Sequence, residues 1–222
     1  MIHELRTYTC RPGTVAEVAK TAGTLGRDIR GDNYGKLEGY WMSEIGPLNQ
    51  VMHLWSYADL NERQRVRGEL AKNPRWTGEY QPAIFPNLLR QEVKLLNAVK
   101  APVAPAAAGN LYELRCYRSK PGAIRQWVNL FTGALEHREK YSKIVALWLT
   151  EAGPQNEVCH LWAYPDLNAR AAVRAASMKD PKWQEFIRAS SPLLEEMHST
   201  VMVPAAHSPL KQLLANGRAR PV

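Results

Sequence analysis

Two stretches of sequence decide the fold, VMHLWSYADLNER at residues 51–63 and VCHLWAYPDLNAR at residues 158–170. Each begins with the alternation of side chains that is typical of a β-strand and continues into an aspartate-led segment that is typical of a helix start. The residues before them repeat too, since EIGPLNQ at 44–50 returns as EAGPQNE at 151–157. The chain is therefore an internal duplication, with an offset of 107 residues between the copies (158 minus 51).

A second pair of matching segments lies near the start of each copy. ELRTY at 4–8 returns as ELRCY at 113–117, with an offset of 109 residues (113 minus 4). The difference between the two offsets indicates a deletion of two residues, which we place in a loop. Alternating segments, helical spacing and Pro-Gly turns then give each copy the order strand, helix, strand, strand, helix, strand. That order is typical of a ferredoxin-like βαββαβ unit.

The predicted fold class is α+β, with two tandem ferredoxin-like βαββαβ units packed sheet to sheet as an intrachain dimeric α/β barrel. Helices on one face of each sheet leave the other face in need of cover, and the second sheet can supply it. A stretch rich in proline and alanine separates the copies, and a basic stretch follows the second. The predicted segments are a first repeat at 1–97, a linker at 98–109, a second repeat at 110–203 and a basic, mobile tail at 204–222.

The composition and net charge limit the partners that the protein could have. The 222 residues carry a formal net charge of +8, of which the tail supplies three through Lys211, Arg218 and Arg220. We assign Arg63 and Arg67 to a solvated helix face rather than to a nucleic-acid surface, because no nucleic-acid-binding motif accompanies them. We therefore predict no specific nucleic-acid partner, and we keep a small acidic ligand as a candidate.

The sequence has no apolar run long enough for a transmembrane helix, and its first ten residues, MIHELRTYTC, do not have the basic stretch and apolar run expected of a secretory leader. The expected localisation is cytoplasmic. The three cysteines, Cys10, Cys116 and Cys159, are too few for a disulfide framework and are interpreted as reduced packing residues.

The repeated strands divide into two sets of side chains, because neighbouring residues of a strand point to opposite faces. We expect the set with leucine, methionine, cysteine and small residues to face the helices. The polar and aromatic set is then expected to line the space between the two sheets. Its members are Glu4, Arg6, Tyr8, His53, Trp55 and Tyr57 in the first copy, and Glu113, Arg115, Tyr117, His160, Trp162 and Tyr164 in the second.

This set has two interpretations. In the first it forms a ligand pocket in which His53 or His160 transfers a proton, Arg6 or Arg115 holds an anionic oxygen, and the aromatic rings stack on the ligand. In the second the same groups pair with one another and form a structural core. No histidine or cysteine spacing typical of a metal site is present, so we predict neither a metal nor a cofactor.

The segments ELRTYTCRPGTV and GPLNQVMHLWSYADLNER, together with their second copies, resemble the NIPSNAP family over nearly the whole chain. The resemblance implies a ferredoxin-like fold of the dimeric α/β-barrel type. Relatives of that fold include cofactor-independent monooxygenases, haem-degrading enzymes and dehydratases. Two functions therefore stay open. One is binding of a small acidic or aromatic molecule, with an oxygenase-like activity. The other is a non-enzymatic interaction or assembly protein, with homo-oligomerisation as a further expectation.

Overall fold

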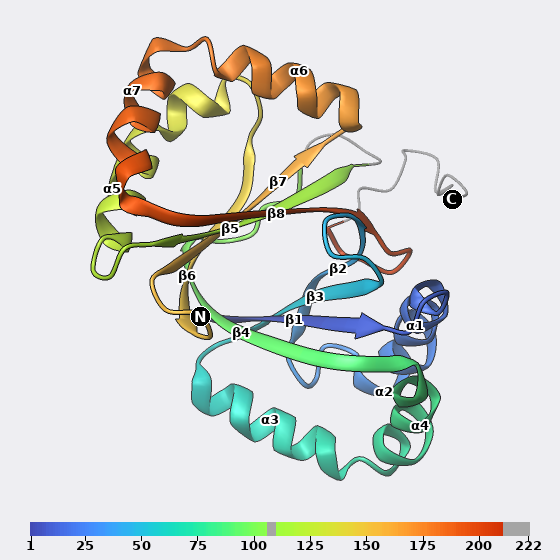
Figure 1. Ribbon diagram of the computed structural model, residues 1–222. Helices are drawn as coiled ribbons and strands as arrows, with labels where there is room; N and C mark the ends of the chain where they lie inside the picture. The colour runs from blue at the N-terminus through green and yellow to red at the C-terminus, as the bar shows by residue number, and fades with distance from the viewer. Residues whose placement is uncertain (106–109, 211–222) are drawn as a thin grey trace. The chain divides into compact units, whose positions relative to one another are not determined.

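The computed structural model describes residues 1–105 and 110–210, which form two units (Figure 1). The first unit contains residues 1–97 and 202–210, and the second contains residues 98–105 and 110–201. Both have the predicted order of strands and helices, so the α+β class with two tandem ferredoxin-like units is confirmed.

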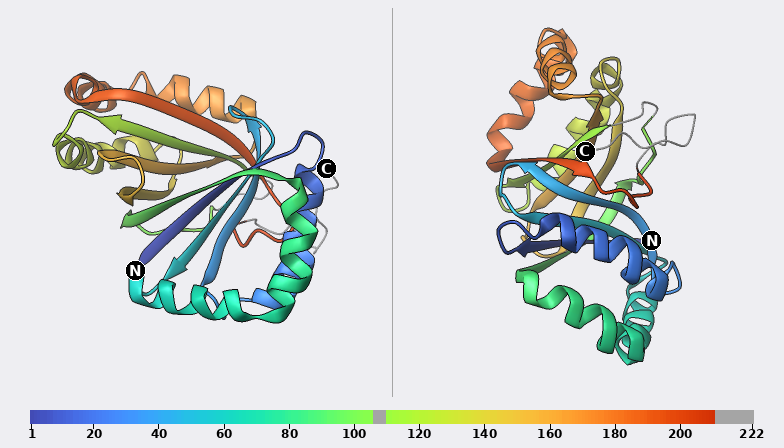
Figure 2. Two further views of the ribbon diagram at one scale, coloured as in Figure 1. Left: turned by 60° about the horizontal axis from the view of Figure 1, so that its bottom comes forward. Right: turned by 90° about the vertical axis from the view of Figure 1, so that its right-hand side faces the viewer.

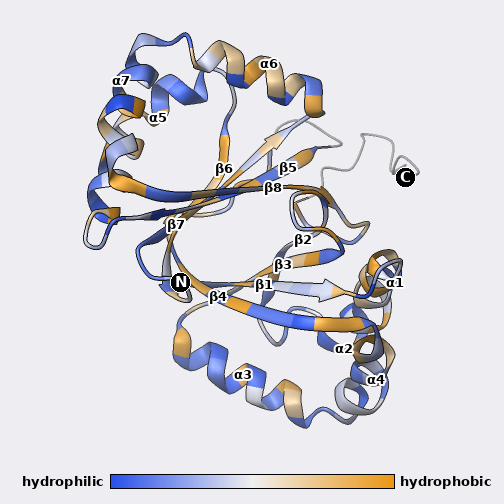
Figure 3. Ribbon diagram, in the orientation of Figure 1, coloured by the Kyte–Doolittle hydropathy of each residue, from blue (hydrophilic) through white to orange (hydrophobic). Residues whose placement is uncertain are grey.

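The first unit is a four-stranded antiparallel sheet with the strand order β4-β1-β3-β2. Its residues 89–93, in β4, are exposed, and that strand is hydrophilic along its middle (Figure 3). Single turns of π-helix at 22–26 and 76–80 precede the short helices α2 and α4. The elements are β1 (Ile2–Cys10), α1 (Val15–Thr21), α2 (Arg27–Arg30), β2 (Lys36–Ile45), β3 (Gln50–Tyr57), α3 (Leu60–Lys72), α4 (Gln81–Ile84) and β4 (Leu88–Lys100).

The second unit repeats this arrangement with the strand order β8-β5-β7-β6. Its helices are more regular, since one continuous helix, α5, takes the place of α1 and α2. The elements are β5 (Leu111–Ser119), α5 (Ile124–Glu139), β6 (Ile144–Ala152), β7 (Glu157–Tyr164), α6 (Leu167–Ser177), α7 (Pro181–Ser190) and β8 (Leu194–Pro204).

The helix that follows the repeated strand begins as the sequence predicts. The Asp59 carboxylate accepts a hydrogen bond of 2.8 Å from the Glu62 backbone N–H, and Asp166 accepts one of 2.7 Å from the Ala169 N–H. Each bond satisfies a backbone donor that the first helical turn leaves free. The Glu62 side chain in turn accepts a bond from the Ala58 N–H, so only the first copy has a reciprocal cap.

Within each unit, the helices cover one face of the sheet (Figures 1 and 2). The core of the first unit joins Tyr8 and Val51 of the sheet to Val18 of α1 and Ile84 of α4. The core of the second joins strand residues to aromatic side chains of α5 and α7. Because both cores use the face that carries the tyrosines, this is the face that sheet and helices share.

The structure describes part of each predicted segment outside the repeats, and the described residues belong to the two units. Residues 98–100 belong to β4, and residues 106–109 of the predicted linker lie outside the described residues, as do residues 211–222 of the predicted tail. The start of the predicted tail packs on the first unit, where the Ala205 N–H donates to the Tyr40 carbonyl at 3.0 Å and the Tyr40 N–H donates to the Ser208 hydroxyl at 2.9 Å. Among the described residues, no helix has the length and apolar character needed to cross a bilayer.

Candidate functional site

The polar and aromatic stripe points toward the helices of its own unit, so the expectation that it lines a space between the two sheets is wrong. Tyr117 and Trp162 pack against Trp127 and Phe131 of α5, and Trp55 packs with Val66 of α3. The physical reason is area: aromatic rings bury more apolar surface than leucine, cysteine or serine, and the helices offer the surface to receive it. Alternation along a strand separates two faces without telling which one meets the helices.

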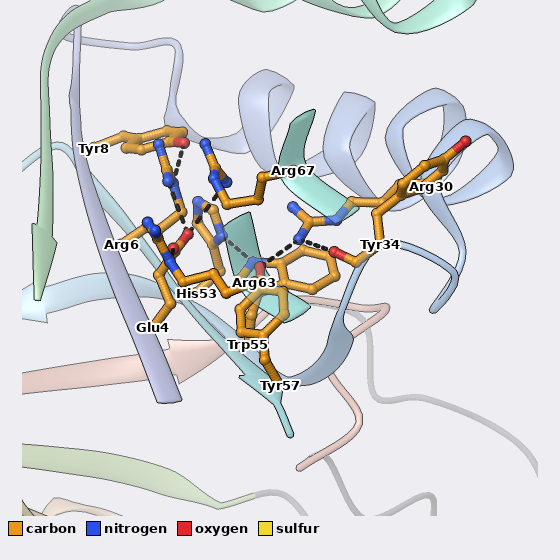
Figure 4. Close-up of polar contacts among 10 residues, drawn as sticks. All are labelled: Glu4, Arg6, Tyr8, Arg30, Tyr34, His53, Trp55, Tyr57, Arg63 and Arg67. Carbon is orange, nitrogen blue, oxygen red and sulfur yellow. Dashed lines mark hydrogen bonds and ion pairs between the residues drawn. The ribbon is translucent and has the colours of Figure 1, made fainter. Parts of the chain in front are cut away.

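The stripe of the first unit is organised around a buried carboxylate (Figure 4). Glu4 is fully buried on β1 and accepts 2.8 Å and 3.3 Å bonds from the guanidiniums of Arg6 and Arg67, and a further bond from Arg63. Arg6 also donates to the Tyr8 hydroxyl at 2.6 Å. Burial alone raises the pKa of Glu4, but the three arginines reverse the effect and lower it. Glu4 is therefore an anion that is held by the protein itself.

The contacts of Glu4 correct the interpretation of Arg63 and Arg67 as a solvated face. Both arginines lie on α3, and both reach the buried carboxylate of β1. Their side chains are 22% and 32% exposed, so the helix presents them inward rather than to water. A buried carboxylate that lost these partners would be strongly unfavourable, which explains why the helix carries arginine at these two positions.

The second unit has the same centre with one of the three partners changed. Glu113 is fully buried and accepts bonds of 3.0 and 2.7 Å from Arg170, one of 2.6 Å from the Ser199 hydroxyl, and one from Arg115. Burial alone raises the pKa of Glu113, but the bonds from Arg170 and Ser199 and the charge of Arg115 lower it to about 2. Arg174, which corresponds to Arg67 at the offset of 107, makes no side-chain hydrogen bond or ion pair within the described parts of the chain.

The two repeated histidines are buried and paired with the repeated tryptophans. The indole N–H of Trp55 donates to His53 Nδ1 at 2.6 Å, and the indole N–H of Trp162 donates to His160 Nδ1 at the same distance. An indole nitrogen can only donate, so Nδ1 must accept, and the proton of each neutral imidazole lies on Nε2. Each histidine therefore presents an N–H donor to its surroundings.

The charges around these imidazoles keep them neutral. Burial lowers the pKa of His160 to about 3, and the guanidinium of Arg115 acts in the same direction, while Glu113 opposes it. Burial and the nearby arginines, with Arg6 foremost, also hold the pKa of His53 well below its usual value. Neither ring is a ready base at neutral pH, because its Nδ1 lone pair is occupied and its Nε2 carries a proton.

A buried arginine that the sequence analysis missed completes each stripe. Arg30, on α2, stacks over Trp55 with 3.3 Å between its guanidinium carbon and the ring centroid, and donates to the Tyr57 hydroxyl at 3.0 Å. Arg138, on α5, stacks over Trp162 at 4.4 Å and donates to the Tyr164 hydroxyl at 3.2 Å. Their offset of 108 falls between the two repeat offsets, and this was the available sequence signal.

Each unit contains a cavity between its sheet and its helices. The cavity of the first unit measures about 200 Å³ and that of the second about 370 Å³. Only the larger one falls within the roughly 300–1,000 Å³ that is usual for small-molecule sites. It is lined by aromatic residues of α5 and α7, by His160 and Trp162 of β7, and by three arginines at 115, 138 and 174. Of the predicted residues, Glu113 and Tyr164 lie beside this cavity as partners of its lining side chains.

Three buried donors of the lining residues of the second cavity lack a partner within the described residues. They are Nε2 of His160, Nε1 of Trp127 and one terminal nitrogen, Nη1, of Arg138. A buried donor without an acceptor costs about 1–3 kcal/mol. All three groups offer protons and none offers a lone pair, so the cavity is suited to a molecule that brings acceptor oxygens.

The family model described as NIPSNAP matches residues 3–102 and again residues 112–209. The chain belongs to the NIPSNAP family. It is 32% identical over 216 residues to protein NipSnap homolog 3B of Mus musculus, with 94% of this chain and 85% of the mouse protein covered. It is 27% identical over 214 residues to protein NipSnap of Drosophila melanogaster, with 94% and 78% covered. The expected family is thus confirmed.

Solved structures extend the likeness in fold beyond the family. An anthrone oxidase-like protein superposes with a TM-score of 0.66 at 8% sequence identity, with 96% of this NIPSNAP chain and 95% of that protein covered. At this identity the likeness concerns the fold alone. The shared fold is of the α+β class that the sequence predicts.

Proposed function

We propose that the second unit binds a small aromatic or apolar carboxylate in the cavity between its sheet and its helices. The observation that carries the proposal is a set of groups without partners in residues 1–105 and 110–210, namely donors of His160, Trp127 and Arg138 and the guanidinium of Arg174. A carboxylate supplies the acceptor oxygens that these groups need, and the aromatic walls supply contact area for its apolar body.

Three arginines and one carboxylate, that of Glu195, line the cavity, so its balance of charges supports an anionic ligand. Arg115 is neutralised by Glu113, whereas Arg174 has no acidic partner in the described chain and Arg138 is bonded to the neutral Tyr164 hydroxyl. The pKa of Arg138 is lowered because its burial opposes the charged form. An anion beside Arg138 and Arg174 would offset that cost, since charge-assisted hydrogen bonds contribute about 1.5–3 kcal/mol.

His160 then serves as a hydrogen-bond donor rather than as a base. The oxygenase-like activity expected from the fold would require a group that removes a proton from the substrate. The Nδ1 lone pair of His160 accepts the bond from Trp162, and its Nε2 carries the proton, so the imidazole can polarise a ligand oxygen without removing a proton. We therefore propose ligand binding as the function of this site and assign it no reaction.

Isothermal titration of the full chain with 2-naphthoate tests the proposal. We expect binding to the native chain and a loss of about 10- to 100-fold in affinity for Arg174→Leu, because one charge-assisted bond of roughly 1.5–3 kcal/mol is removed. The neutral analogue 2-naphthamide should bind more weakly by a similar factor.

The first unit supplies the matched control. Arg67 occupies the position equivalent to Arg174 but bonds to Glu4, so Arg67→Leu should leave the affinity for 2-naphthoate unchanged. Equal affinities of the acid and the amide, or an undiminished affinity of Arg174→Leu, would show that the cavity does not select an anion.

A further inference from the structure

Two of the three cysteines lie directly opposite each other on neighbouring strands of the second unit. Cys116 of β5 pairs with Cys159 of β7 in the antiparallel register, and their Sγ atoms are 2.9 Å apart. Directly opposed residues of an antiparallel pair have Cα atoms about 4.5–5.5 Å apart, which falls within the roughly 4.4–6.8 Å that a disulfide spans. The two backbones therefore need no rearrangement for the two sulfurs to bond.

The environments of the two thiols differ. Cys116 is half-buried, whereas Cys159 is fully buried. The Cys159 thiol also donates to the Glu157 carboxylate at 3.4 Å, and the same carboxylate oxygen accepts a 2.8 Å bond from the Thr150 hydroxyl. One sulfur is thus open to a small oxidant, and the other is next to a group that can take its proton.

We propose that Cys116 and Cys159 form an oxidation site at which a hydroperoxide converts the two thiols into a cross-strand disulfide. In the first step Cys116 Sγ attacks the terminal peroxide oxygen, so an S–O bond forms, the O–O bond breaks, and an alcohol or water leaves with the thiol proton. In the second step Cys159 Sγ attacks Cys116 Sγ, so the S–S bond forms and the S–O bond breaks. Glu157 takes the Cys159 proton and passes it to the departing hydroxide, which leaves as water. The two thiols lose two electrons and the peroxide gains them.

The same cluster fits a metal ion less well. Cys116, Cys159 and Glu157 place their ligand atoms within 4.8 Å of one another. Tetrahedral zinc sites use four ligands with Zn–S bonds of about 2.3 Å, which requires the sulfurs to lie farther apart than their present 2.9 Å. Disulfide formation instead moves them closer together, in the direction that the strand register already favours.

The site is particular to the second unit. The equivalent pair in the first unit is Thr7 opposite Met52, which has no thiol. Cys10, which is buried on β1, lies opposite Leu88 of β4 rather than opposite a cysteine. Cys10 therefore serves as an internal control for reaction at a buried thiol.

The test is treatment of the folded full chain with hydrogen peroxide, followed by denaturation, alkylation with iodoacetamide and peptide mass spectrometry. We expect one intramolecular link between Cys116 and Cys159, with Cys10 fully alkylated. If all three cysteines are alkylated as in the untreated chain, or if the link joins Cys10 or two different chains, the proposal is wrong.

Two variants separate the roles of the sulfurs. Cys159→Ser should accumulate a sulfenic acid at Cys116 that dimedone traps, whereas Cys116→Ser should give no trapped adduct at the buried Cys159. Glu157→Gln should slow formation of the link by up to about 100-fold, because the proton acceptor is lost. A dimedone adduct at Cys159 instead of Cys116 would show that the roles of the two sulfurs are assigned wrongly. This result can be measured even if Glu157→Gln fails to fold.

Discussion

The two units share one buried centre and differ in what surrounds it. In the first unit Tyr40 stacks on His53 with 5.2 Å between the ring centroids, and His207 lies against Tyr40 at 4.5 Å, which leaves a cavity of about 200 Å³. In the second unit the position of Tyr40 is Leu147, and the cavity measures about 370 Å³.

The two buried carboxylates also differ in one of their partners. Glu4 accepts a bond from Arg67, whereas Glu113 accepts one from Ser199 instead, and Arg174 has no partner among the described residues. The comparison teaches that a duplicated network can pair an arginine with its carboxylate in one copy and leave the equivalent arginine without a partner among the described residues of the other. The divergent residues include strand positions, since Tyr40 belongs to β2, Leu147 to β6 and Ser199 to β8.

The buried carboxylates should give the largest effect on stability in both units. Replacing Glu113 with glutamine leaves Arg115 and Arg170 without their anion, and we expect a loss of about 3–5 kcal/mol in the free energy of unfolding. Glu4→Gln should cost a similar amount. Urea denaturation measures both, and a loss under about 1 kcal/mol in either variant would show that the shared centre is not structural in that unit.

The pH dependence of the free energy of unfolding should show that His160 is neutral in the folded chain. Its pKa falls from 6.5 in the unfolded chain to about 3 in the fold, so the unfolded chain binds the proton more tightly and stability falls as pH drops below 6.5. The contribution is about 1.4 kcal/mol per pH unit, or roughly 2 kcal/mol between pH 6.5 and 5. Denaturation of His160→Gln at several pH values should show that this part of the pH dependence of the free energy of unfolding is missing.

If the stability of His160→Gln depended on pH as steeply as that of the wild type, His160 would be protonated in the fold.

Glu113 makes a second contribution to the pH dependence of stability, at lower pH. Its folded pKa of about 2 lies below the value of 4.5 in the unfolded chain, so its stabilisation is fully present above pH 4.5 and is lost as pH falls toward 2. Comparison of the wild type with Glu113→Gln between pH 5 and 3 isolates that contribution.

The packing at the first cavity should be sensitive to one methyl group. A Cβ added at Gly23 would overlap the ring of His207, so Gly23→Ala forces that ring to move. We expect a loss of about 1–3 kcal/mol in the free energy of unfolding, as is usual for overpacking. A thermal melt checks this, and an unchanged midpoint would show that His207 does not pack there.

The equivalent region of the second unit should respond in the opposite direction. Gly133 lies within α5, and a Cβ there meets no atom within 4 Å. Gly133→Ala should therefore stabilise the chain by about 0.5–1 kcal/mol, because alanine favours the helix without a clash. A destabilised Gly133→Ala would remove the contrast between the two helical layers.

The sequence predicted the duplication, the βαββαβ order and the helix caps at Asp59 and Asp166, because these depend on local spacing and on repeated residues. It also identified the stripe that contains His53, His160 and their tryptophans. It did not identify the face on which the stripe lies. Alternation fixes which side chains share a face, whereas the choice of face depends on the whole area that the helices bury.

The arginines of the helices were the other omission. Arg63 bonds to a carboxylate 59 residues away in the chain, and Arg170 bonds to one at a separation of 57, so no local pattern indicates these pairs. Repetition of Arg67 as Arg174 at the offset of 107 was a signal, but it does not tell which of the two is paired.

The sequence by itself thus determined the architecture of each unit and the chemical groups of its centre, since both follow from local pattern and from repetition. Only the tertiary structure decided that these groups face the helices, that Arg174 has no partner in the described part of the chain, and that Cys116 lies opposite Cys159. Those facts arise from contacts between distant segments, whose geometry depends on how complete layers of side chains pack.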